Sequence, residues 1–139
     1  MKENPYSKEG GDILVKMAEV QFNESIPIYL QLMERIKHDI ISGSLEPGAK
    51  MSSVRDLAAR FSVNPNTMQK ALSELEREEL LHAERTAGRF VTTNKLLIES
   101  IRYKEARGIT EDFIRQMRSL GYSEEEMIDF LPYTFKEEE

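Results

Sequence analysis

The side chains best suited to chemistry lie at the start of a helix predicted from Pro65 to about Glu79. Asn64 and Pro65 open this helix with a side-chain cap and a proline in the first turn. Its apolar residues recur at helical spacing on one face. The other face is polar: Asn66, Thr67, Gln69, Lys70 and Ser73. Such groups can hydrogen-bond to the base edges and phosphates of nucleic acid. An ordinary helical hairpin with a solvated polar face is the alternative.

A shorter helix is predicted directly before it, over Val54–Phe61. Ser53 is placed to cap this helix, and Asp56 follows three residues later, which is a capping box with Asp in the position of Glu. Ser62 and Val63 then form the turn between the two helices. Two helices joined by a tight turn, the second with an exposed polar start, are typical of a helix-turn-helix.

Two strand-like runs follow, Leu81–Glu84 and Phe90–Thr93, separated by the glycine-containing turn Arg85–Arg89. We interpret them as a two-stranded ribbon with an arginine at each end of its tip. Directly after a helix-turn-helix, such a ribbon is the wing of a winged helix. Its tip can lie along a DNA backbone or insert an arginine into the minor groove. A plain surface hairpin with solvated arginines is the alternative.

The segment before the helix-turn-helix predicts a further helix and a short strand. The helix is expected to begin at Ser25–Pro27, with Ser25 as its cap, and to end at Gly43. Its buried stripe comprises Tyr29, Leu32, Met33, Ile36 and Ile40. Lys50–Met51 is expected to form the strand.

From Asn94 the chain is predicted to be helical to its end. We expect a kink or a short break near Gly108, because glycine costs about 1 kcal/mol in a helix interior relative to alanine. A glycine stop at Gly121, a capping box from Ser123 to Glu126 and a helix end at Pro132 complete the prediction. Helices of this size cannot bury their apolar faces alone, so they must dock on the winged helix, on a second copy, or on both.

The length and composition exclude several classes of protein and site. At 139 residues, 40% of them apolar, the chain suffices for one compact domain or a small domain with an appendage. It has no cysteine, which excludes disulfides and thiolate sites. No apolar run approaches the roughly 18 residues of a membrane span, and the N-terminus lacks the core of a signal peptide. We therefore expect a cytoplasmic protein without membrane contact. Residues 1–24 are interpreted as an arm, with at most a short helix over Asp12–Val20.

The net charge of −6 is unevenly distributed along the chain. Residues 1–26 carry three basic against five acidic side chains, residues 27–95 ten against nine, and residues 96–139 six against eleven. Most of the acidic charge thus lies outside the predicted DNA-binding part, which is itself nearly neutral. We expect a modest affinity for DNA of any sequence that depends on where the cations are placed and falls with salt.

Nothing in the sequence predicts an enzyme, a metal site or a cofactor. His38 and His82 lie far apart, each without a neighbouring carboxylate motif or cysteine. The acidic runs over 74–79 and 124–126 are interpreted as solvated helix faces and a capping box rather than acid–base pairs. No feature identifies a small-molecule effector, so that question stays open.

Several separated motifs occur in a fixed order between residues 25 and 93. They are Pro27-Ile28-Tyr29-x-Gln31, Leu45-x-Pro47-Gly48, Ser53-Val54-Arg55-x-Leu57-Ala58, Asn64-Pro65-Asn66-Thr67-x-x-Lys70-Ala71 and Gly88-x-Phe90-Val91. Together they resemble the DNA-binding domain of GntR-type bacterial transcription regulators. The sequence departs from that family at Met51-Ser52, at Glu79, where a glycine commonly ends the helix, and in the wing, where Gly-x-Gly-Thr is replaced by Thr86-Ala87-Gly88-Arg89.

The resemblance implies a mainly α fold with a small β wing. It divides the chain into an N-terminal arm (1–24), a winged helix-turn-helix domain (25–93) and a helical dimerisation domain (94–139). Only 46 residues follow Thr93, too few for the large domains of other branches, and this short helical tail resembles the YtrA branch. The resemblance further implies a homodimer that binds a palindromic operator in double-stranded DNA, often as the repressor of a transporter operon.

Nine residues are the candidates for contact with DNA: Ser53, Arg55, Asn64, Asn66, Thr67, Gln69, Lys70, Arg85 and Arg89. The first two can hold a phosphate, and the Arg55 guanidinium can also reach guanine. Those at the start of the second helix would enter the major groove, with Gln69 as a base reader and Lys70 as a phosphate contact. The last two arginines flank the wing tip. The alternative function is a winged-helix module that docks on other proteins through its acidic tail.

Overall fold

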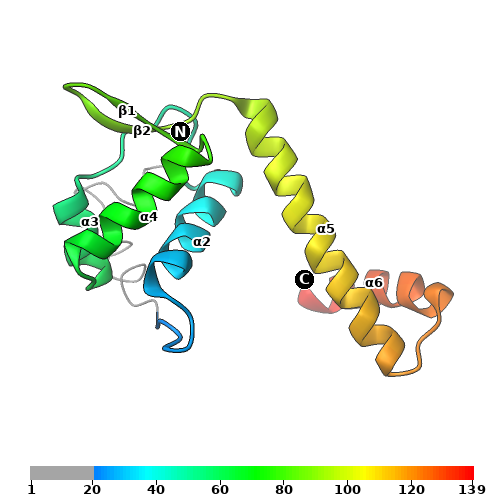
Figure 1. Cartoon of the computed structure of the whole chain (residues 1–139). Coiled ribbons are helices and arrows are strands. Elements are labelled where there is room, and N and C mark those ends of the chain that lie inside the picture. The colour runs from blue at the N-terminus through cyan, green and yellow to red at the C-terminus, as the bar shows by residue number, and fades with distance from the viewer. Residues whose placement is uncertain (1–20) are drawn as a thin grey trace. The chain divides into compact units, whose positions relative to one another are not determined.

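The computed structural model describes residues 21–139, so the helix expected over Asp12–Val20 lies outside the described residues. The elements, in chain order and with the labels of Figure 1, are α2 (Ile28–Ile41), α3 (Val54–Phe61), α4 (Pro65–Arg77), β1 (Leu81–Glu84), β2 (Gly88–Val91), α5 (Lys95–Ser119) and α6 (Glu124–Glu138). The chain forms two compact units whose boundary falls within α5, after Glu99. The predicted mainly α fold with a small β wing is confirmed.

In the first unit, α2 and α4 lie side by side and α3 packs on α4 (Figure 1). β1 and β2 form an antiparallel hairpin in which Leu81 lies opposite Val91 and Glu84 lies opposite Gly88. The helix-turn-helix is therefore α3–α4, and the wing is β1–β2, in the order that the sequence predicted.

The expected strand over Lys50–Met51 is reduced to a single bridge beside the wing. Lys50 bridges Phe90, and the amide of Met51 donates to the Arg89 carbonyl at 2.9 Å. The amide of Val91 donates to the Ala49 carbonyl at 2.8 Å. The segment before α3 thus lies along the outer edge of β2 and ties the wing to the helices.

The core of the first unit is built from the apolar stripes of its helices and the inner faces of its strands. Its fully buried large side chains are Leu32, Ile36, Ile40, Leu45, Leu57, Met68, Leu72, Leu75, Leu80, Leu81 and Val91. Tyr29, expected in the buried stripe of α2, is only half-buried. Asp39 is buried as well, and its carboxylate is held by Arg35 at 3.2 Å.

The predicted cap of α2 is wrong. The helix begins at Ile28 behind Pro27, whose backbone is extended, and no side chain caps it in the usual way. Gln31 instead fixes the entry: its side chain accepts from the Asn23 amide at 2.8 Å and donates to the Asn23 and Ile26 carbonyls. Ser25 lies too early to cap a helix that starts after Pro27, and it donates to the Asn23 side chain.

Two helix ends in this unit place a residue other than glycine in the left-handed region. Ser62 (φ 54°) ends α3 and Glu79 (φ 65°) follows α4. In the first turn, the Val63 amide donates to the Ala58 carbonyl at 2.9 Å, and the corresponding bond after α4 runs from Leu80 to Leu75 at 3.0 Å. Both are Schellman motifs, a geometry that usually selects glycine.

The second unit departs from the sequence predictions at two places. α5 runs unbroken through Gly108, and α6 continues past Pro132 to Glu138. The cost of one glycine is small beside the hydrogen bonds of a 25-residue helix. Pro132 lacks an amide hydrogen and so removes one helical bond, yet the turns on either side of it keep α6 continuous.

The turn between α5 and α6 follows the prediction. Gly121 has a φ of 93°, and the Tyr122 amide donates to the Met117 carbonyl, which completes a Schellman motif. Ser123 and Glu126 then form a reciprocal capping box, with bonds of 3.2 Å and 3.1 Å between each side chain and the other backbone amide. Among the helices of residues 21–139, none is both long enough and apolar enough to cross a membrane.

Candidate nucleic-acid interface

The start of α4 presents the polar face that the sequence predicted. The Asn64 side chain accepts from the Asn66 amide at 2.8 Å, which caps the helix ahead of Pro65. The apolar face is buried through Met68, Ala71, Leu72 and Leu75. This burial leaves the opposite face to solvent: Asn66, Gln69, Lys70 and Ser73 are exposed and Thr67 is half-buried. The exposed side chains are amides, a hydroxyl and an ammonium, which match base edges and phosphates.

The start of α3 carries a cap and an exposed cation. The Ser53 hydroxyl accepts from the Asp56 amide at 3.1 Å, so this serine stabilises the helix end in the structure. Arg55 is exposed, and its guanidinium makes no hydrogen bond or ion pair with any residue of the described range 21–139. A guanidinium next to a helix N-terminus is suited to holding a phosphate.

A hollow of about 870 Å³ separates the start of α3 from the wing. Lys50, Ser52 and Ser53 line one side, and residues 83–89 line the other. The charged groups around it are three cations and two carboxylates: Lys50, Arg85, Arg89, Asp56 and Glu84. Lys50 was not among the candidate residues predicted from the sequence. Its place in a predicted strand next to the wing was the one signal that could have found it.

Arg89 does not lie at the wing tip. β2 begins at Gly88, so Arg89 is a strand residue opposite Ala83, and the tip is the turn from Arg85 to Ala87. The predicted boundaries of the turn are therefore wrong. The Arg89 guanidinium forms an ion pair with Glu76 of α4, and both side chains are largely buried. This pair fixes the wing to the helix whose start carries the polar face.

Lys70 lies over the ring of Tyr29 in α2. Its Nζ is 3.9 Å from the ring centroid, well within the range of a cation–π interaction. Tyr29 was expected to be a core residue of α2. This contact joins α2 and α4, which are not consecutive in the chain, and no local sequence pattern predicts it.

The acidic run after the start of α4 is more than a solvated face. Glu76 binds Arg89, Glu78 pairs with Lys37 of α2 at 3.2 Å, and Glu74 pairs with Arg77 at 3.6 Å. The interpretation as plain surface charge is therefore wrong for Glu76 and Glu78, which join α4 to the wing and to α2. These pairs neutralise carboxylates that would otherwise repel a polyanion.

The nine predicted residues thus fall into two groups. Five have structural partners: Ser53, Asn64, Gln69, Lys70 and Arg89. The side chains of the other four make no hydrogen bond or ion pair within residues 21–139: Arg55, Asn66, Thr67 and Arg85. The structure brings together the residues of α4, and separately the start of α3 and the wing tip around the hollow.

Comparison with known proteins finds relatives along most of the chain. A family described as "Bacterial regulatory proteins, gntR family" matches residues 28–91. The HTH-type transcriptional regulator YhcF of Bacillus subtilis (strain 168) is 38% identical over 109 residues, which is 78% of this chain and 90% of YhcF. The HTH-type transcriptional repressor YtrA of the same strain is 38% identical over 78 residues, 56% of this chain and 60% of YtrA.

A solved structure shares the arrangement of elements. A GntR family transcriptional regulator from Listeria monocytogenes has a TM-score of 0.73 and 38% sequence identity. The alignment covers 81% of this chain and 98% of that one. The likeness therefore extends beyond the winged helix into the helices that follow it.

Proposed function

Because the chain belongs to the GntR family of DNA-binding bacterial transcription regulators, we propose that it binds a palindromic operator as a homodimer and represses the genes behind it. The supporting observation is the exposed polar start of α4, flanked by Arg55 of α3 and by Arg85 of the wing. These three elements supply groups for the major groove, the backbone and the minor groove.

Within this proposal, the side chains without structural partners, together with Gln69, carry the sequence readout. Asn66 and Thr67 enter the major groove, with Gln69 one turn further along α4. Arg55 binds a phosphate or a guanine, and Arg85 lies along or within the minor groove. The remaining candidates, Ser53, Asn64, Lys70 and Arg89, contact the backbone or hold its neighbours in place.

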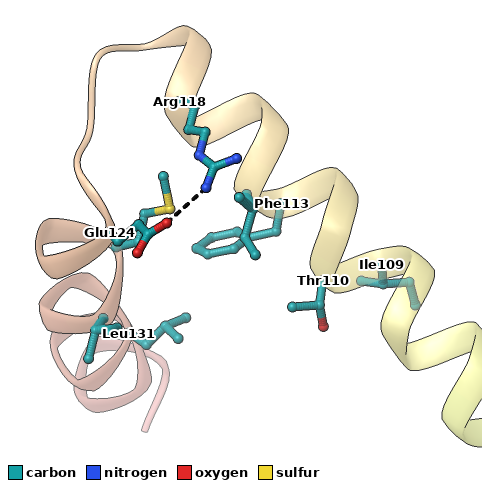
Figure 2. Close-up of a pocket in the computed structure, with 9 residues that line it drawn as sticks. Ile109, Thr110, Phe113, Arg118, Glu124 and Leu131 are labelled. Carbon is teal, nitrogen blue, oxygen red and sulfur yellow. Dashed lines mark hydrogen bonds and ion pairs between the residues drawn. The ribbon is translucent and has the colours of Figure 1, made fainter.

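The homodimer is supported by the apolar surface of the second unit. Ile109 and Leu120 are 70% and 73% exposed, and Ile128 and Tyr133 on α6 are 69% and 72% exposed. Between α5 and α6 lies a hollow of about 610 Å³ with apolar walls. Figure 2 shows Phe113 directed toward α6 across this hollow. Ile109 and Ile128 line this hollow, and exposed apolar surface of this kind marks a contact site for another protein surface.

A second copy of the chain is the partner that we assign to this apolar surface, because a dimer suits the DNA-binding face of the first unit. One winged helix gives a small contact with DNA, whereas two on a two-fold axis read inverted half-sites spaced by about one helical turn or a multiple. We assign residues 25–93 to DNA binding and 94–139 to dimerisation. Repression is supported by the relative YtrA, which is a repressor, and the resemblance to the YtrA branch favours a transporter operon as the target.

Selection of bound duplexes from a pool of random sequences tests this proposal. The full chain is expected to enrich an inverted repeat, and the gene that follows that repeat in the source genome identifies the regulated operon. The variant Asn66→Ala is expected to bind the same sites more weakly and with relaxed preference at one position of each half-site. Enrichment of a single half-site, or no enrichment, contradicts the proposal.

A further inference from the structure

The contact between Lys70 and Tyr29 joins the recognition face of α4 to a neighbouring helix. Lys70 lies on the exposed side of α4, one turn after Asn66, and its Nζ lies 3.9 Å from the Tyr29 ring centroid. α2 and α4 lie side by side in Figure 1, and their packing is the most extensive between helices of the first unit. The ring therefore reaches the polar face from a separate element.

Lys70 is not engaged by the carboxylates of its own helix. Glu74, four residues later, is the acidic neighbour that a helix would place beside it. That carboxylate pairs with Arg77 at 3.6 Å. Within residues 21–139, the contact assigned to the Lys70 ammonium is the aromatic face of Tyr29, which leaves the N–H donors that point away from the ring available to an anion.

Tyr29 is itself held firmly. It lies in the first turn of α2, and the Gln31 side chain fixes the chain before that turn through bonds of 2.7 to 2.8 Å to Asn23 and Ile26. At the far end of α2, Lys37 pairs with Glu78 beyond the end of α4 at 3.2 Å. The Lys37–Glu78 pair thus ties α2 to the end of α4, and the Gln31 bonds fix the chain that leads into α2, so the ring has a defined position relative to the recognition face.

A lysine side chain is flexible, and it loses rotamer freedom when its ammonium binds a phosphate. A ring that already holds the ammonium near its binding position reduces this loss, which is the general effect of preorganisation. The ring also leaves the charge in place, because a cation–π contact does not neutralise the ammonium as a carboxylate would.

We propose that Tyr29 is a positioning residue that presents Lys70 to a phosphate of the DNA backbone on the side of α4 that faces α2. This inference rests on the proposed DNA binding. Tyr29 acts through its ring alone, so phenylalanine retains the effect and leucine loses it.

The test measures binding of the full chain to a mixed-sequence duplex of about 30 base pairs at several salt concentrations. Lys70→Gln is expected to weaken binding and to reduce the salt slope by about one unit, because one phosphate contact is lost. Tyr29→Leu weakens binding by about two- to five-fold, the range of an exposed cation–π contact. Tyr29→Phe binds like the unaltered chain.

The Lys70→Gln background separates positioning from a structural role. In that background, Tyr29→Leu and Tyr29→Phe are expected to bind equally, since the group that the ring positions is gone. In the Lys70 chain, an upfield ring-current shift of the Lys70 side-chain protons in the NMR spectrum is retained by Tyr29→Phe and lost by Tyr29→Leu. The thermal unfolding curve of each variant shows that it is folded.

Two results would overturn the inference alone: unchanged binding of Tyr29→Leu, or an equal loss from Tyr29→Leu with and without Lys70. With either result, binding of the duplex by the unaltered chain would still fall steeply with salt, so the proposed function would stand. Absence of salt-dependent binding by the unaltered chain overturns the proposed function, and the inference with it.

Discussion

The two units of the chain differ in how much of their apolar surface is buried. Of the eighteen buried apolar residues among those described, Met127 is the single one that lies in the second unit. That unit instead exposes nine large apolar side chains: Tyr103, Ile109, Leu120, Tyr122, Ile128, Phe130, Leu131, Tyr133 and Phe135. The first unit therefore has a core of its own, whereas the second leaves most of its large apolar side chains exposed.

This difference separates two tasks along one chain. The first unit holds the candidate DNA-contacting side chains on a framework fixed by buried leucines, capped helix starts and the Arg89–Glu76 pair. The second unit has well-formed helix ends, yet little apolar burial to stabilise it, since each square ångström of apolar surface removed from water contributes about 25 cal/mol. Its stability is expected to depend on association, whereas that of the first unit is not.

Removing the second unit is the most severe test of this comparison. A chain ending at Glu99, which keeps the buried Ile98, is expected to fold as a monomer because its core is complete. Loss of the second linked half-site contact weakens operator binding by about 100- to 10,000-fold. Sedimentation and DNA titration measure the two effects. A dimeric 1–99 fragment would break the comparison, because dimerisation would then belong to the first unit.

A core substitution tests whether the first unit is stable by itself. Leu72→Ala is expected to lower the free energy of unfolding by about 2–5 kcal/mol, because a fully buried leucine leaves a cavity. Denaturant unfolding of the full chain measures the loss, which should not vary with protein concentration. The matched change Ile128→Ala, on the exposed face of α6, acts chiefly on dimer dissociation. If Leu72→Ala acted on dimer dissociation and Ile128→Ala lowered the stability at every protein concentration, the self-contained core would belong to the second unit instead.

An arginine in each unit tests where the affinity for DNA resides. Arg55→Ala is expected to cost about 1–3 kcal/mol of operator binding at fixed salt, since a contact to phosphate or guanine is lost. Arg115→Ala in α5 removes the same charge from an exposed position beside Asp112, and it should leave the affinity nearly unchanged. Equal losses from both variants would show that bulk charge, rather than placement, governs binding.

The smallest effect concerns two equivalent helix ends. Glu79 and Gly121 occupy the same left-handed position of a Schellman motif, one in each unit. Glu79→Gly is expected to stabilise the first unit by about 1 kcal/mol, because the left-handed region is strained for a residue with a Cβ atom.

Gly121→Ala is the reciprocal change, and it should destabilise by a similar amount. An added Cβ there would meet no atom within 4 Å, so the cost is conformational. Thermal unfolding measures both variants. If Glu79→Gly does not raise the stability, then contacts of the glutamate side chain offset the strain.

The features that the sequence predicted correctly are local ones. Ser53, Asn64 and Ser123 cap helices through bonds to amides two or three residues away. The apolar stripes of α3 and α4 follow the helical period, and the wing strand Leu81–Glu84 has its predicted bounds. Short-range patterns determine these features, because the partner of each group is a near neighbour in the chain.

The features that the sequence did not predict correctly are of two kinds. Some are contacts between distant residues, and others depend on small free energies that oppose one another. Glu76 binds Arg89 thirteen residues away, and Lys70 meets a ring in another helix. The breaks predicted at Gly108 and Pro132 rest on local penalties of about 1 and 3 kcal/mol, which neighbouring helical hydrogen bonds can outweigh. The nine DNA contacts stay predictions, because a side chain shows its role only when the DNA is bound.

The segment along the outer edge of β2 has a consequence for the behaviour of the wing in solution. Exposed strand edges are templates for pairing with other chains, and this is a common route to aggregation. On β2 that edge is occupied by residues 48–51, whose backbone bonds to Arg89 and Val91 leave no room for another strand. The remaining edge belongs to β1, which is four residues long and carries His82 and Glu84. The wing can therefore project from the protein without recruiting strands from its neighbours.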